Sequence, residues 1–211
     1  MRKEFIPTII FALLVSLLCL PAQAQISGAC IDFEALADGT RYDGDDYQPG
    51  DVLFTEDDVP VAFNEFVYEN GTTDMFHIDV QNLDGGFTEH PDQLGNALWV
   101  SNATATFDFS KLDYTVNRLS FEFIELGGDY NLSVNGEPVR FLNTLTDVPT
   151  EVAEDVFISF EIDDEDEFFN WGTATLVGDI ESLTIGGQEF YVDHFCFEAN
   201  DDFSCNISNL N

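Results

Sequence analysis

Three carboxylates near the two ends of the chain are the residues whose types and spacing best suit metal chemistry. Asp32 and Glu34 are two positions apart in an alternating segment, so we expect both on the face opposite Ile31 and Phe33. Asp193 lies in the last apolar segment. If the first and last segments are neighbouring strands, the three acids meet and need a cation. The prediction is calcium, which takes roughly six to eight oxygen ligands; the alternative is three solvated surface acids.

Aromatic side chains beside polar residues could bind sugars, because a flat ring stacks on a pyranose while polar groups hold its hydroxyls. Trp171 follows an acidic run and is predicted to be an exposed platform at the edge of a loop. Trp99 alternates with apolar residues and is predicted to belong to the core instead. The other candidate ligand-binding residues are three tyrosines predicted to lie in loops, Tyr42, Tyr47 and Tyr68.

The histidines do not form a catalytic or zinc-binding motif. His77, His90 and His194 have no metal-ligand spacing with one another or with cysteine, and no Gly-x-Ser-x-Gly nucleophile motif occurs. With 41 Asp and Glu residues, two carboxylates at glycosidase spacing would arise by chance. We therefore predict no catalytic residues and keep a small secreted hydrolase as the less favoured alternative.

The elements that must position these residues are short β-strands. In residues 118–126, Leu119, Phe121 and Phe123 alternate with polar side chains, which is the pattern of a half-buried strand. Similar segments recur along the chain, separated by clusters of Gly, Asp, Asn and Pro. No stretch has a sustained helical period. The predicted fold class is all-β, a single antiparallel jelly-roll-type β-sandwich of about twelve short strands.

Two dipeptides predict tight hairpin turns. Asn135-Gly136 suits a type I′ turn, and Gly186-Gly187 occupies the corresponding place between two apolar segments. Each would join two neighbouring antiparallel strands of the sandwich.

The cysteines predict one disulfide in the mature chain. Cys30 lies in the first predicted strand and Cys196 in the last, so a bridge between them would close nearly the whole domain. A bridge between Cys196 and Cys205, which would hold the C-terminal tail, is the main alternative. We favour Cys30–Cys196.

The first residues have the organisation of an export signal. Arg2 and Lys3 precede an apolar stretch at 9–20, and Ala22-Gln23-Ala24 offers a cleavage site. We predict a signal peptide at 1–24 cleaved near Ala24, a β-sandwich domain at 25–198 and a polar tail at 199–211. The expected location is secreted or extracytoplasmic.

The net charge of −35 restricts the partners. Such a field repels nucleic acid and anionic membranes, and no second apolar segment suggests membrane insertion. A saline habitat and bound divalent cations both remain as explanations of the acidity.

Short motifs at both ends of the domain resemble a known group of proteins. Ile31-Asp32-Phe33-Glu34, a Gly-Thr-Arg-Tyr turn at 39–42 and the closing segment at 191–195 look like calcium-stabilised jelly-roll domains, which include galactose-binding-like folds and carbohydrate-binding modules. The resemblance implies that Glu34 and Asp193, with Asp32, ligate a structural calcium ion. His194 departs from the family pattern, which often has Asp or Asn there.

The resulting functional prediction is a secreted, acidic, calcium-binding β-sandwich that acts as a non-catalytic carbohydrate-binding or adhesion module. Its expected partner is an extracellular polysaccharide or a cell-surface glycan. The alternative from another class is an extracellular matrix protein that self-associates through calcium.

Overall fold

The computed structural model describes residues 27–84, 95–165 and 170–199. The predicted signal peptide, His90 and Cys205 lie outside the described residues. The described chain forms fourteen strands, all paired antiparallel, and two single-turn 3₁₀ helices, which confirms the predicted all-β sandwich of jelly-roll type. The strands are β1 (Ser27–Ile31), β2 (Arg41–Asp43), β3 (Val52–Glu56), β4 (Val59–Val67), β5 (Thr73–Asp74), β6 (His77–Asn82), β7 (Asn96–Ser101), β8 (Ala103–Asp108), β9 (Val116–Val134), β10 (Arg140–Leu142), β11 (Glu151–Ala153), β12 (Val156–Glu165), β13 (Asn170–Ile180) and β14 (Ser182–Ala199); the 3₁₀ helices are η1 (Phe109–Lys111) and η2 (Leu145–Asp147).

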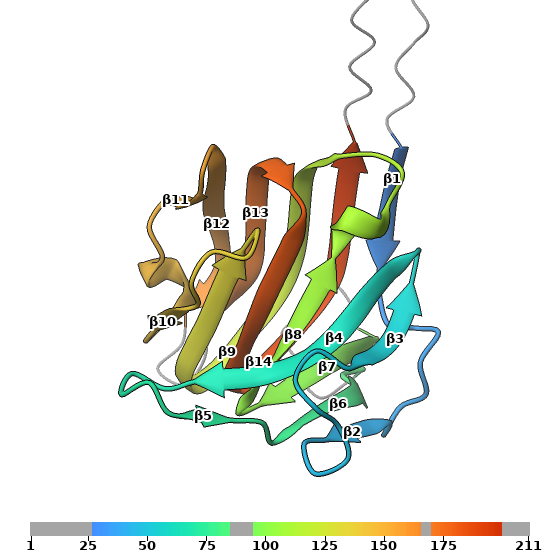
Figure 1. Ribbon diagram of the computed structural model, residues 1–211, viewed down its shortest axis with the longest axis vertical. Helices are drawn as coiled ribbons and strands as arrows, with labels where there is room; N and C mark the ends of the chain where they lie inside the picture. The colour runs from blue at the N-terminus through green and yellow to red at the C-terminus, as the bar shows by residue number, and fades with distance from the viewer. Residues whose placement is uncertain (1–26, 85–94, 166–169, 200–211) are drawn as a thin grey trace, which may run out of the picture. The chain divides into compact units, whose positions relative to one another are not determined.

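Strands β9 and β14 are much longer than predicted and run antiparallel to each other through the centre of the fold (Figure 1). Their register extends from Leu183 opposite Val134 to Ala199 opposite Val116. Strand β13 flanks β9 and continues to β12 and β11, whereas β8, β7 and β1 flank successive parts of β14. Beyond β8 lie β4 and β3, and beyond β7 lie β6 and β2. The two long strands therefore connect every part of the sandwich.

Alternation along β9 builds the core as the sequence predicts. Leu119, Phe121 and Phe123 are at most 2 % exposed. Phe195 of β14 lies among them and stacks on Phe121 and Phe107, with ring centroids 5.2 and 4.0 Å apart. Stacked rings of this kind add to the free energy gained from apolar burial.

The two ends of the described chain lie side by side, because β1 pairs with the end of β14. Cys30 is directly opposite Cys196, and the two form a disulfide, which confirms the predicted pairing. Strand β14 ends at Ala199, one residue beyond the predicted end of the domain.

The predicted turn at Asn135-Gly136 is confirmed. Both residues have positive φ, +54° and +73°, as a type I′ turn requires, and Glu137 N donates to Val134 O at 3.0 Å. The turn connects β9 to β10.

The predicted turn at Gly186-Gly187 was wrong, since both residues lie inside β14. A Cβ on Gly186 would lie 2.1 Å from Ala103 O, and one on Gly187 would lie 2.8 Å from the Tyr130 ring. These positions need glycine because neighbouring groups approach the backbone closely. Within a strand, glycine can therefore mark a close contact instead of a turn.

Candidate functional site

Asp32 and Glu34 do not share a strand face, because β1 ends at Ile31. Phe33 adopts a left-handed conformation with φ +58°, and its buried ring packs edge-on against Phe195. This turn is stabilised by Asp32, whose Oδ1 accepts Glu34 N at 3.1 Å. The prediction that both acids extend from one strand face was therefore wrong, since a side-chain hydrogen bond and core packing favour a turn.

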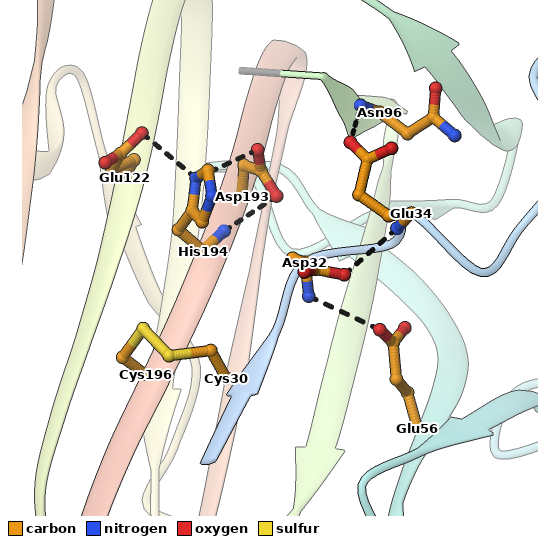
Figure 2. A network of polar contacts seen from close by, with 9 residues as sticks. All are labelled: Cys30, Asp32, Glu34, Glu56, Asn96, Glu122, Asp193, His194 and Cys196. Atoms are coloured by element: carbon orange, nitrogen blue, oxygen red, sulfur yellow. Dashed lines mark hydrogen bonds and ion pairs between the residues drawn. A yellow bond between two sulfur atoms is a disulfide. The ribbon is translucent and has the colours of Figure 1, made fainter. Parts of the chain in front are cut away.

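The carboxylate of Glu34 points away from Asp193 and toward the start of β7 (Figure 2). Its Oε1 accepts Asn96 N at 2.7 Å, and a Cβ on Gly95 would lie 1.8 Å from this oxygen. Asp32 N donates to Glu56 Oε1 at 3.4 Å. Glu34 thus connects the β1–β2 turn to β7.

Asp193 lies at a β-bulge, where one extra residue of β14 faces β9. The inserted residue is His194, with φ +48°, so both Asp193 and His194 point toward Glu122 (Figure 2). His194 Nδ1 is 3.2 Å from Asp193 Oδ2 and 3.4 Å from Glu122 Oε2. We call these three residues the bulge cluster.

Opposite charges meet in the bulge cluster, where His194 lies between two carboxylates. Burial raises the pKa of Asp193 to about 6, although His194 opposes the shift. Hydrogen bonds to Asp193 and Glu122 raise the pKa of His194 to about 10, so its ring is a cation at neutral pH. The sequence prediction did not include Glu122 as a partner of Asp193. The alternation in β9 places Glu122 on its polar face, and this was the only sign that it could contact a neighbouring strand.

The three predicted calcium ligands therefore each contact a different partner, and their carboxylates do not meet at one point in this arrangement. Within residues 27–84, 95–165 and 170–199, no three His, Cys, Asp or Glu side chains form a group that could hold a metal ion. Calcium binding stays a prediction from the resemblance.

The predicted exposure of Trp171 was wrong. Trp171 is only 7 % exposed, because it lies directly opposite Ile124 and in the same apolar cluster as Tyr191. Trp99, predicted to be core, is half-buried on that same outer side of the sheet. Trp171 is therefore not a surface platform, and Trp99 is the more exposed of the two rings.

The predicted ligand-binding tyrosines also differ in exposure. Tyr42 lies in β2 rather than in a loop and is 7 % exposed. Tyr47 is half-buried, with its ring edge-on to those of Tyr42 and Phe63. Of the three, Tyr68 alone lines a hollow described below.

An open hollow of about 380 Å³ lies between the β4–β5 turn and the β9–β10 region. This volume is within the range of ligand-binding pockets. The two aromatic side chains that line it, Tyr68 and Phe141, are both half-buried. We call it the Tyr68 hollow; its lining residues are Tyr68, Glu69, Asn70, Thr72, Asp129 and Phe141.

One buried amide holds the two walls of the Tyr68 hollow together. Asn131 is fully buried; its Oδ1 accepts Val67 N at 2.6 Å and its Nδ2 donates to Val67 O at 2.9 Å. Val67 precedes Tyr68, and Phe141 lies directly opposite Asn131 in the β9–β10 pair. Asn131 therefore sets the position of Tyr68 relative to Phe141.

A second set of neutral hydrogen bonds lies behind the hollow. Tyr68 Oη donates to Asn102 Oδ1 at 3.0 Å, and Gln188 Nε2 donates to the same oxygen at 3.3 Å. Gln188 Oε1 accepts Asp129 N at 2.9 Å. These bonds link the residues on both sides, so the hollow is formed before any ligand arrives.

The β4–β5 turn is also fixed locally. Asn70 Oδ1 accepts Thr72 N at 2.9 Å and Thr72 Oγ1 at 2.7 Å. Burial and nearby Asp74 raise the pKa of Tyr68, so its hydroxyl stays protonated at neutral pH. With Glu69 and Asp129 in the lining, the hollow has acceptors for hydroxyl donors and disfavours anions.

In comparisons with family models, curated proteins and solved structures, none matches the chain. The described segments contain no helix long and apolar enough to cross a membrane.

Proposed function

We propose that the protein is a non-catalytic module that binds a neutral extracellular polysaccharide or cell-surface glycan in the Tyr68 hollow. The observation that carries the proposal is a preformed hollow of about 380 Å³ that combines two aromatic rings with amide, hydroxyl and carboxylate groups. Aromatic faces suit the apolar faces of sugars, and the oxygen-rich rim suits their hydroxyls. The net charge of −35 and the acidic rim favour neutral over anionic glycans.

We also infer that the chain reaches an extracytoplasmic compartment through the segment at 1–24. The Cys30–Cys196 disulfide is compatible with an oxidising environment. N-terminal sequencing of the mature protein is expected to start at Gln25; an intact Met1 would contradict the inference.

The test of the binding function is affinity electrophoresis through gels that contain xyloglucan, galactomannan or mixed-linkage β-glucan, with alginate as the anionic comparison. We expect retardation in at least one neutral gel and none in alginate. Phe141→Ala is expected to weaken retention about tenfold, the effect of about 1.4 kcal/mol of lost contact. The matched control is Phe157→Ala, because Phe157 is 47 % exposed and does not line the hollow.

Tyr68→Phe separates two roles of the ring. It keeps the stacking face but loses the hydrogen bond to Asn102, so retention should change less than with Tyr68→Ala. Release of reducing ends from the retained glycan would contradict a non-catalytic role. Equal retention of the Phe141→Ala and Phe157→Ala proteins would exclude this hollow as the binding site.

A further inference from the structure

Strands β7, β6 and β2 form one end of the sheet (Figure 1). The strand register places a row of side chains across the outer side of this end. Trp99 is directly opposite Asp79, and Asp79 is directly opposite Arg41. Residues that alternate with them, including Ile78 and Tyr42, belong to the core, so the row faces away from it. Directly opposite residues lie about 4.5–5.5 Å apart, so the row spans the width of a short glycan segment.

The ring of Trp99 is half-buried and held in place from one side. It lies against Tyr191, with ring centroids 4.5 Å apart and planes inclined by 49°. Tyr191 Oη donates to Gln81 Oε1 at 2.7 Å, which fixes the supporting ring. A ring oriented in this way loses little conformational entropy when a ligand stacks on it.

Arg41 supplies oriented donors at the other end of the row. Its Nη2 donates to His77 Nδ1 at 2.8 Å, and its Nε and Nη1 lie 3.4 Å from Asp43 and 3.6 Å from Asp79. A guanidinium group has five N–H donors, so these three contacts leave two for a ligand. The Arg41 side chain is 45 % exposed, and its guanidinium lies 5.7 Å from the Phe76 ring centroid.

The guanidinium is held by a neutral histidine and two carboxylates. Because a guanidinium only donates, Nδ1 of His77 must be the acceptor, which places the ring proton on Nε2, 3.5 Å from Asp79 Oδ2. Burial and the Arg41 charge lower the pKa of His77, although Asp79 opposes the shift, so the ring is neutral at pH 7. The neighbouring carboxylates thus compensate the positive charge of Arg41, so the group does not attract anions strongly.

We propose that Trp99 and Arg41, with Asp79 between them, form a second glycan-binding site, separate from the Tyr68 hollow, that takes a neutral pyranose segment. The ring of Trp99 would stack on the apolar face of the sugar, and the two remaining Arg41 N–H groups would donate to its hydroxyl or ring oxygens. The ligand class is shared with the proposed function, but the residues are different. One chain therefore binds two glycan segments, which increases retention on a polymer through effective concentration.

The test is isothermal titration of the purified protein with short oligosaccharides cut from xyloglucan, galactomannan and mixed-linkage β-glucan. We expect two sites per chain for at least one of them. Arg41→Gln and Trp99→Ala should each leave one site, and Tyr68→Ala should leave the other. Arg41→Gln changes an exposed side chain, so it tests the site even if Trp99→Ala lowers the stability. Phe157→Ala is the control and should leave two sites.

Each outcome separates the two proposals. A single site that is lost in Tyr68→Ala and unchanged in Arg41→Gln would overturn the second site and leave the Tyr68 hollow intact. Loss of binding in Arg41→Gln with none in Tyr68→Ala would support the Trp99–Arg41 site and overturn the hollow. An absence of binding to all three oligosaccharides would overturn both.

Discussion

The Tyr68 hollow and the bulge cluster both depend on β9 and β14, yet neutral amides build the first and charges build the second. In the hollow, Asn131 makes two hydrogen bonds to Val67, and a cavity of about 380 Å³ remains open in front of it. In the bulge cluster, His194 lies between Asp193 and Glu122, and the adjoining cavity is only about 10 Å³. That is room for one water molecule at most.

The difference indicates a division of roles. The bulge cluster adjoins a cavity too small for a ligand, whereas the neutral amides behind the hollow leave an open space lined by Tyr68, Phe141 and two carboxylates. The bulge cluster is therefore better explained as a structural feature next to the disulfide, and the hollow as a binding site. Four perturbations test this contrast.

The largest effect is expected from removal of the disulfide beside the bulge cluster. Cys30→Ser with Cys196→Ser opens a connection between residues 166 positions apart, which the chain-entropy model values at about 5 kcal/mol. Denaturant unfolding measures the loss. Where the variant remains folded, its glycan affinity should equal that of the unmodified protein. A parallel loss of affinity would show that the hollow depends on this end of the sheet.

Asn131→Ala should lower stability less but abolish binding in the Tyr68 hollow. It removes both hydrogen bonds between the Asn131 amide and the Val67 backbone, a loss of about 3 kcal/mol in the free energy of unfolding. Asn143→Ala, at an exposed position, is the control. Thermal unfolding and gel retardation should both change for Asn131→Ala; retardation equal to that of the unmodified protein would separate Asn131 from the Tyr68 hollow.

The sequence predicted features that depend on local alternation or on the pairing of the chain ends. Leu119, Phe121 and Phe123 face the core because alternation needs no knowledge of the partner strand. The Cys30–Cys196 disulfide followed from placing the first and last strands side by side. The first inference uses only the period of a β-strand, and the second uses only the order of the strands along the chain.

The candidate site was less predictable, because it depends on which strands become neighbours. Tyr68 was named as a loop aromatic, but Phe141 and Asn131 join it only through the β4–β9 contact and the β9–β10 register. Trp171 is buried because Ile124 lies opposite it. The turn at Phe33 depends on a hydrogen bond between two acidic residues, which alternation cannot reveal.

The pH dependence of stability should come from the bulge cluster and not from the hollow. His194 has a raised folded-state pKa of about 10, so its stabilisation is full below its ordinary value of 6.5 and is lost as pH rises toward 10. Asp193, whose pKa is raised to about 6, also makes stability fall as pH rises, between about pH 4 and 6. Because the His194 ring is 39 % exposed, solvent screening reduces its effect to about 1 kcal/mol.

His194→Asn is the variant that tests this account, since asparagine tolerates positive φ and carries no charge. Unfolding free energies from pH 7 to 9 should fall for the unmodified protein and stay level for the variant. Measurements stop at pH 9 because tyrosines such as Tyr130, whose pKa is raised by burial, add their own pH dependence above it. An equal slope in both proteins would contradict the role of His194.

The smallest effect is expected from divalent cations. Asp32, Glu34 and Asp193 have separate partners, so calcium and magnesium at equal ionic strength should raise the unfolding midpoint equally and without saturation, by screening the charge of −35. A saturable rise with calcium alone would instead mean that the three carboxylates rearrange around an ion. Glu34→Gln would then remove that rise, and the bulge cluster would be part of a metal site after all.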